Sequence, residues 1–215
     1  MRRLFEAALG GLAMLGAVLL SPVLRPWYRR WGATADEDTR ALPGDGLMIQ
    51  PRLTSTRAVT IRASSRIVWA WLSQIGQGRA GFYSYDLLET MAGLDSHNAE
   101  RLLPSLQAIS VGDRIYLGRH NRSFFSVAAV DRRHSLVLRG GDENVSSVWT
   151  FALDTLPSGD TRLVVRDRTY FPRTLGSFVI WRVLTDPIHF IMERKMLLGI
   201  KARAERTHPD ELREG

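Results

Sequence analysis

Four polar and aromatic residues that lie close together in the sequence form the densest group capable of chemistry. Tyr83, Tyr85, Asp86 and Glu89 directly follow a glycine-rich stretch. Asp86 and Glu89 are three residues apart, so they would share one face of a helix. On that face they could line the mouth of a cavity and orient a ligand through hydrogen bonds. The alternative is structural, with Asp86 capping the helix or pairing with Arg79.

Two arginines on one predicted strand are the second candidate. Arg166 and Arg168 are two residues apart, and therefore point to the same face of a strand. If that face is directed inward, two buried guanidinium groups require partners, either Asp86 and Glu89 or the anionic group of a ligand. If it is directed outward, the two arginines form a stripe exposed to solvent.

Large apolar side chains indicate where a core or a cavity wall would lie. Trp149, Phe151 and Leu153 alternate along a strand and give it one apolar face. Met192 and Met196 lie one turn apart on the predicted last helix, and methionine suits adaptable apolar pockets. Packing in the core is the ordinary role of these residues, and lining of a ligand cavity is the functional alternative.

Several kinds of catalytic and cofactor site are absent from the sequence. Without cysteine the chain has no thiol nucleophile, cysteine-ligated zinc or iron–sulfur cluster. Its five histidines lack the spacing of metal ligands, and there is no G-x-S-x-G serine motif. Residues 76–81 match G-x-G-x-x-G, but a helical pattern precedes them, whereas a dinucleotide site needs a strand there. We therefore expect neither a metal nor a cofactor, and we expect a sharp turn at these glycines.

The elements that must position these residues follow from hydrophobic periodicity. Alternation predicts strands at 57–63, 114–117, 123–130, 136–139, 147–154 and 162–171. Helical spacing predicts helices at about 65–75, 85–91, 176–184 and 186–206. Asp186 should cap the last helix, with Pro187 at its first position. The order predicts an α+β fold, in which an antiparallel sheet buries one long helix against its concave face and leaves room for a cavity.

The first residues of the chain differ in composition from the rest. Residues 7–24 carry no charge and are nearly all apolar, enough to span most of a hydrocarbon layer of about 30 Å. Two arginines precede this run, and basic and aromatic residues follow it at 25–31, as at a membrane–water interface. A single-pass membrane anchor is the prediction, and a cleaved signal peptide or a buried core helix are the alternatives. Two arginines precede the run and three directly follow it, and this excess favours a cytoplasmic position for the domain that follows the anchor.

Length and composition limit the organisation of the remaining chain. With 215 residues, 45% of them hydrophobic, one core is expected. The net charge of +7 comes from arginines spread along the chain, so we do not expect nucleic-acid binding. Acidic and turn-forming residues at 32–54 predict a linker between an anchor at 1–31 and a domain at 55–215.

Three separated stretches resemble the SRPBCC superfamily: VWAWLSQIGQGRAGFYSYDLLE (68–89), RLLPSLQAISVGD (101–113) and IMERKMLLGIKARAE (191–205). Together with WGAT-like and PGD-like stretches at 31–34 and 43–45, they are similar to a membrane-anchored bacterial branch. The resemblance implies a START-like helix-grip fold, in which the sheet wraps around the C-terminal helix and encloses a ligand cavity. Because the superfamily includes lipid carriers, hormone receptors and aromatase/cyclases, it implies function only as a class.

Three functions follow as hypotheses. The first is a membrane-tethered protein that binds a hydrophobic small molecule or lipid. The second is an enzyme of the polyketide cyclase/dehydrase kind, whose acid–base groups would be among the tyrosines, carboxylates and arginines named above. The third is an interaction protein with a vestigial cavity. A polar patch deep in a roomy pocket would favour the enzyme, an apolar pocket the carrier and a collapsed pocket the interaction protein. The candidate ligand-binding residues are Trp71, Arg79, Tyr83, Tyr85, Asp86, Glu89, Trp149, Arg166, Arg168, Met192 and Met196.

Overall fold

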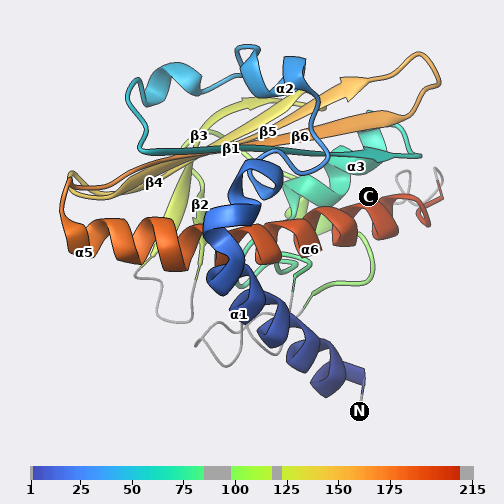
Figure 1. Cartoon of the computed structure of the whole chain (residues 1–215). Coiled ribbons are helices and arrows are strands. Elements are labelled where there is room, and N and C mark those ends of the chain that lie inside the picture. Colours follow the sequence, from blue (N-terminus) through green and yellow to red (C-terminus); the bar gives the residue numbers. More distant parts are fainter. Residues whose placement is uncertain (1, 85–97, 118–122, 209–215) are drawn as a thin grey trace.

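The computed structural model describes residues 2–84, 98–117 and 123–208, and its centre is one antiparallel sheet beside a long C-terminal helix (Figure 1). Within these residues the strands are β1 (Leu53–Ile61), β2 (Arg114–Tyr116), β3 (Phe124–Asp131), β4 (Ser135–Gly141), β5 (Ser146–Thr155) and β6 (Thr161–Tyr170). Their order across the sheet is β1-β6-β5-β4-β3-β2, so the first strand pairs with the last. The helical elements are α1 (Arg2–Tyr28), α2 (Ala35–Thr39), η1 (Asp45–Leu47), α3 (Ser65–Ser73), η2 (Pro104–Leu106), α5 (Leu175–Ser177), η3 (Phe178–Thr185) and α6 (Asp186–Ala204). The predicted α+β helix-grip architecture is confirmed.

The strands predicted from alternation are all present, and their boundaries differ by only a few residues. The largest difference is at β1, which begins at Leu53 rather than at Arg57. The longer strand is explained by β6, because Leu53 pairs with Thr169 and the pairing continues without a break to Ile61. The tertiary partner therefore extends a strand beyond the segment in which alternation is visible.

The C-terminal helix is longer than predicted because no break occurs at Asp186. The π-helical segment η3 runs directly into α6, and Thr185 and Asp186 both have helical backbone angles. A regular α-helix passing through Pro187 would lose a hydrogen bond, and the wider π turns lie directly before it. The prediction that Asp186 caps a new helix is wrong, since its carboxylate instead contacts α1.

The main core lies between the inner face of the sheet and the helices α3 and α6. It contains Trp71 and Leu72 of α3, Phe151 and Val165 of the sheet, and Leu197 of α6. Side chains on a strand alternate between faces, so the residues between these inward positions point away from the core. The inner face therefore positions the site, and the outer face needs a different cover.

The glycine turn predicted at 76–81 is confirmed. It follows α3 directly, and Gly76, Gly78 and Gly81 all have positive φ, which glycine adopts without steric cost. A further glycine, Gly199 of α6, lies against the next part of this loop. A methyl group at Gly199 would overlap the carbonyl oxygen of Tyr83, so the absence of a side chain allows the helix to approach this closely.

Of the predicted linker 32–54, residues 32–52 cover the outer face of the sheet (Figure 1), and the last two residues already belong to β1. The Thr34 side chain and Glu37 form a reciprocal capping box at the start of α2. Glu37 also forms an ion pair with Arg162 of β6 at 2.7 Å, and Asp45 pairs with Arg166 at 2.7 Å. The outward arginines of β6 thus hold this segment in place.

Helix α1 packs against α6 at its C-terminal end and is exposed over most of its length. The Tyr28 ring stacks on Phe190 of α6 with ring centroids 5.1 Å apart, and its hydroxyl donates to Asp186. After the helix, the chain joins the edge of the sheet, since Arg29 and Trp31 accept backbone hydrogen bonds from β1. Among the described residues one helix is long and apolar enough to cross a membrane, Ala8–Tyr28 of α1.

Candidate functional site

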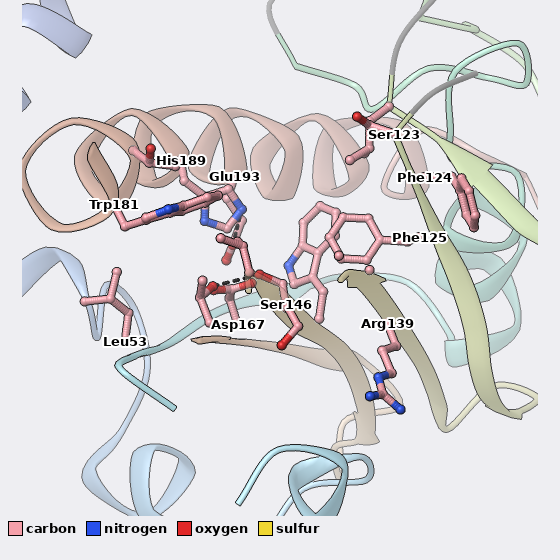
Figure 2. Close-up of a pocket in the computed structure, with 18 of the residues that line it drawn as sticks. Leu53, Ser123, Phe124, Phe125, Arg139, Ser146, Asp167, Trp181, His189 and Glu193 are labelled. Carbon is pink, nitrogen blue, oxygen red and sulfur yellow. Dashed lines mark hydrogen bonds and ion pairs between the residues drawn. The ribbon is translucent and has the colours of Figure 1, made fainter. Parts of the chain in front are cut away.

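A cavity of about 1170 Å³ lies between the inner face of the sheet and the helical segment formed by η3 and α6. Side chains from β3, β4, β5 and β6 form one wall, and Trp181, Thr185, His189 and Met192 belong to the other. Ligand pockets of drug-sized molecules are roughly 300–1,000 Å³, so this space suffices for a small molecule of that size. Figure 2 shows the two walls facing one another across the cavity.

One part of the cavity wall is apolar and aromatic. Trp149 of β5 lies at its centre, with its ring centroid 5.8 Å from Phe125 and 6.5 Å from Phe82. Met192 and Met196 of α6 complete this part of the wall. Adaptable methionines and rigid aromatic rings together suit the body of a hydrophobic ligand.

The other part of the wall carries the carboxyl groups of Asp167 and Glu193 and the imidazole of His189; we call these three residues and Arg57, which does not itself line the cavity but pairs with Glu193, the polar patch. The side chains of Arg57 and Glu193 are both 0% exposed, and Nη1 of Arg57 lies 3.1 Å from Oε2 of Glu193. The same oxygen lies 3.5 Å from Nε2 of His189, one helical turn earlier on α6. Burying a charged group costs free energy unless an opposite charge accompanies it, and the ion pair between Arg57 and Glu193 meets this requirement.

Asp167 faces the same space from β6, between Ser55 of β1 and Trp149 of β5. Its Oδ1 accepts a hydrogen bond of 2.8 Å from Thr169, whose hydroxyl is 2.8 Å from that of Ser147. Burial raises the pKa of the Asp167 carboxyl above its ordinary range, and the carboxylate of Glu193 adds to this, whereas His189 opposes it. The raised pKa lets Asp167 keep its proton to a higher pH than an exposed aspartate does, and the protonated carboxyl can donate a hydrogen bond.

The chemistry that this arrangement offers is hydrogen bonding and proton transfer at one end of an apolar space. The positive charge of Arg57 offsets the negative charge of Glu193, while burial raises the pKa of Asp167. Within the described part of the chain, the indole N–H of Trp149 and Oε1 of Glu193 have no hydrogen-bond partner. Both residues line the cavity, and buried polar atoms without partners are uncommon in proteins.

The structure places the predicted site residues in three different environments. Trp149, Met192 and Met196 line the cavity. Tyr85, Asp86 and Glu89 lie outside the described residues. The other predicted residues, Trp71, Arg79, Tyr83, Arg166 and Arg168, are described and do not line the cavity.

Tyr83, Trp71 and Arg79 contact other residues of the protein. The Tyr83 hydroxyl donates to the Trp71 carbonyl at 3.0 Å and accepts from Gln74 at 3.0 Å, deep in the core. Burial raises the pKa of Tyr83 well above its usual range, so the phenol stays neutral. Arg79 donates to the carbonyls of Ser73 and Leu106 and thereby fastens the loop after α3.

Arg166 and Arg168 point to the outer face, away from the cavity. Both pair with Asp45, at 2.7 Å and 2.9 Å. Arg166 also donates to the carbonyls of Glu37 and Arg40. The outward alternative is therefore the correct one, but the arginines are covered by residues 32–54 and do not form a solvated stripe.

The polar patch was missed because its members come from three elements. A usable indication was present in β6, where Leu163 and Val165 define the inward face and Asp167 continues it. Glu193 and His189 are four residues apart and share one face of the last helix. Side chains two residues apart on a strand share a face, so Asp167 lies on the inward face with Leu163 and Val165. Its neighbours Arg166 and Arg168 lie on the outward face.

The fold and the cavity define a helix-grip protein with an internal space of ligand size.

No protein-family model matches the chain, and no curated protein matches its sequence. Solved structures resemble it at low identity. Protein jhp0584 from Helicobacter pylori is 12% identical, with 80% of this chain and 99% of that chain covered and a TM-score of 0.47. Protein MLL2253 from Mesorhizobium loti is 15% identical, with 73% and 99% covered and a TM-score of 0.44. The Aha1 dimer from Colwellia psychrerythraea is 14% identical, with 72% and 97% covered and a TM-score of 0.42. At these values the likenesses carry no information about ligand or activity.

Proposed function

We propose that this protein binds a hydrophobic small molecule or lipid that carries a polar group, and that α1 anchors it in a membrane. The observation that carries the proposal is the cavity, which combines an aromatic and methionine-lined wall with a buried polar patch. The apolar wall would hold the body of the ligand, and the polar patch would hydrogen-bond its polar group. The resemblance of the sequence to SRPBCC proteins supports the same class of function.

The surface of α1 supports the membrane anchor. Leu12, Leu19 and Val23 are all more than half exposed, in a helix with few buried residues before its C-terminal end. Monomeric soluble proteins seldom expose continuous apolar surface of this extent to water. A bilayer would cover it, and the excess of arginines after the apolar run favours the cytoplasmic side for the domain.

The polar patch favours an enzyme as the second candidate. Asp167, with its raised pKa, and His189, which contacts Glu193, are groups that can donate and accept protons beside a bound molecule. This chemistry fits the acid–base steps of a polyketide cyclase/dehydrase-like reaction, with no cofactor required. An interaction protein with a vestigial cavity has less support, because the cavity is large rather than collapsed.

Ligand binding is tested on the full chain in lipid nanodiscs by native mass spectrometry, followed by identification of the released compound. A stoichiometric adduct is expected from the wild type. Met192→Trp should reduce it, because the larger ring narrows the apolar part of the cavity, whereas Ile49→Trp, at an exposed position among residues 32–52, should not. Absence of any adduct, or an adduct that Met192→Trp leaves undiminished, contradicts the proposal.

The same measurement separates the enzyme from the carrier. If the polar patch is catalytic, His189→Gln should accumulate a compound that differs in mass from that bound by the wild type. If the protein only binds, the variant should hold the same compound or none.

A further inference from the structure

A second exposed apolar surface lies beside α1, on the helical segment that leads into α6. It is formed by six side chains that are 37–79% exposed, and we call it the η3 face: Leu175, Phe178, Val179, Ile180, Leu184 and Ile188. No acidic residue occurs between Tyr170 and Asp186, whereas Arg173 and Arg182 do. The surface is thus apolar with a basic border.

The two sides of η3 face different surroundings. Trp181 and Thr185 point into the cavity, as Figure 2 shows for Trp181. Ile180 and Leu184, each one position earlier, belong to the exposed η3 face. One helical layer therefore separates the cavity from whatever covers the η3 face.

The position of the η3 face relative to α1 is set by a shared carboxylate. Oδ2 of Asp186 lies 3.0 Å from Nε of Arg25 and 3.6 Å from Nη1 of Arg182. Arg25 is the first charged residue after the apolar run of α1, so it marks the level at which that helix leaves the apolar layer. Because Asp186 contacts both arginines, η3 lies at this same level.

The arrangement in Figure 1 agrees with this placement. The segment from α5 into α6 and the helix α1 lie on one side of the sheet, whereas residues 32–54 lie on the other. An apolar surface with basic neighbours, at the depth of an interfacial arginine, matches an amphipathic helix lying in the headgroup region. The basic border also complements the negative charge of anionic lipids.

We propose that the η3 face is immersed in the headgroup and upper acyl region of the same bilayer that α1 crosses, so that the wall of the cavity is itself a membrane-contacting helix. This inference rests on the proposed membrane anchor and adds a second, independent contact to it. Its occupant is a bilayer containing anionic lipid. A second copy of the chain or another protein on this face would be a different result.

The test uses single-cysteine variants of the full chain, because the native sequence has no cysteine. A spin label is attached at Ile180→Cys, at Leu12→Cys as the anchor control and at Ile49→Cys as the aqueous control. These positions are 52%, 66% and 83% exposed. In nanodiscs containing anionic lipid, collision with oxygen reports the bilayer, and collision with a nickel chelate reports water.

The labels at Leu12 and Ile180 should collide preferentially with oxygen, with Ile180 at the shallower depth, and the label at Ile49 with nickel. If Leu12 is in the bilayer while Ile180 is accessible to nickel, the η3 proposal is overturned and the anchor stands. If Leu12 itself is accessible to nickel, the anchor proposal fails. Protection of Ile180 from both reagents, or dipolar broadening between labels, would assign the face to a protein contact and also overturn the proposal.

Discussion

Removing one partner of the ion pair between Arg57 and Glu193 should destabilise the protein far more than removing both. Both side chains are fully buried and 3.1 Å apart, so either single change leaves an uncompensated charge in the interior. Such a loss costs about 3–5 kcal/mol. Arg57→Met also loses a hydrogen bond from Nε to the carbonyl of Tyr28, which adds about 1 kcal/mol.

The double variant Arg57→Met/Glu193→Leu should recover most of this loss, because two apolar side chains of similar volume replace the pair. We expect the double variant to lie within about 2 kcal/mol of the wild type, which gives a coupling energy of about 5 kcal/mol or more. For a chain of this size, each single change should lower Tm by roughly 10 °C.

The assay is a double-mutant cycle on the free energy of unfolding, measured for the full chain by urea titration in one detergent. Lys201 of α6 and Glu205, which directly follows that helix, form a partly exposed ion pair that provides the matched cycle, with an expected coupling of about 0.5 kcal/mol. Single losses below about 1 kcal/mol, or losses that simply add in the double variant, would show that this pair is not a buried, coupled unit.

Three further predictions concern other parts of the fold. Gly199→Ala should destabilise the protein by about 1–3 kcal/mol, because its methyl group overlaps the Tyr83 carbonyl, and urea titration measures this. Asp167 has a raised pKa, so the folded state holds its proton more tightly and stability falls as pH rises above about 4, the ordinary aspartate value. Asp167→Asn should remove this decrease, as seen by unfolding titrations from pH 4 to 8. Asp45→Asn should loosen residues 32–54 by weakening the contact with Arg166, and limited proteolysis should cut this segment sooner.

Each of these predictions has a control and a contrary outcome. Gly176→Ala has open space around its new methyl group and should not destabilise, so equal losses at both glycines would contradict the steric argument. Asp131→Asn, at an exposed site, should leave the pH dependence unchanged. Asp36→Asn lies in the same outer segment but is exposed, so equally fast cleavage of this variant would argue against a specific role for Asp45.

The sheet and the last helix were predictable because their burial repeats along the sequence. Inward residues of β5, such as Trp149 and Phe151, alternate with outward ones, and this pattern is visible without a structure. The continuity of η3 and α6 was not predictable from the same information. Asp186 and Pro187 are typical of a helix start, and only the contact with Arg25 shows that Asp186 serves another element.

The position of residues 32–52 on the sheet and the polar patch both depend on contacts between residues that are far apart in the sequence. Asp45 and Arg166 are 121 residues apart in the sequence, so no local pattern indicates their contact. The polar patch likewise requires β1, β6 and α6 to place Arg57, Asp167 and Glu193 side by side. Local spacing led instead to Arg166 and Arg168, since a pair of arginines is conspicuous and a single inward aspartate is not.

The short path between α1 and the sheet has a mechanical consequence. A flexible chain over residues 32–54 would have a root-mean-square end-to-end distance of about 26 Å, so the domain would sample a wide volume around its point of attachment. Here the backbone of Arg29 and Trp31 is bonded to β1 immediately after the helix, and the following residues are fixed to the sheet. With α1 in a bilayer as proposed, the domain stands at one height and one angle. A ligand of the proposed kind would then be met by lateral movement in two dimensions, not by searching the space above the surface.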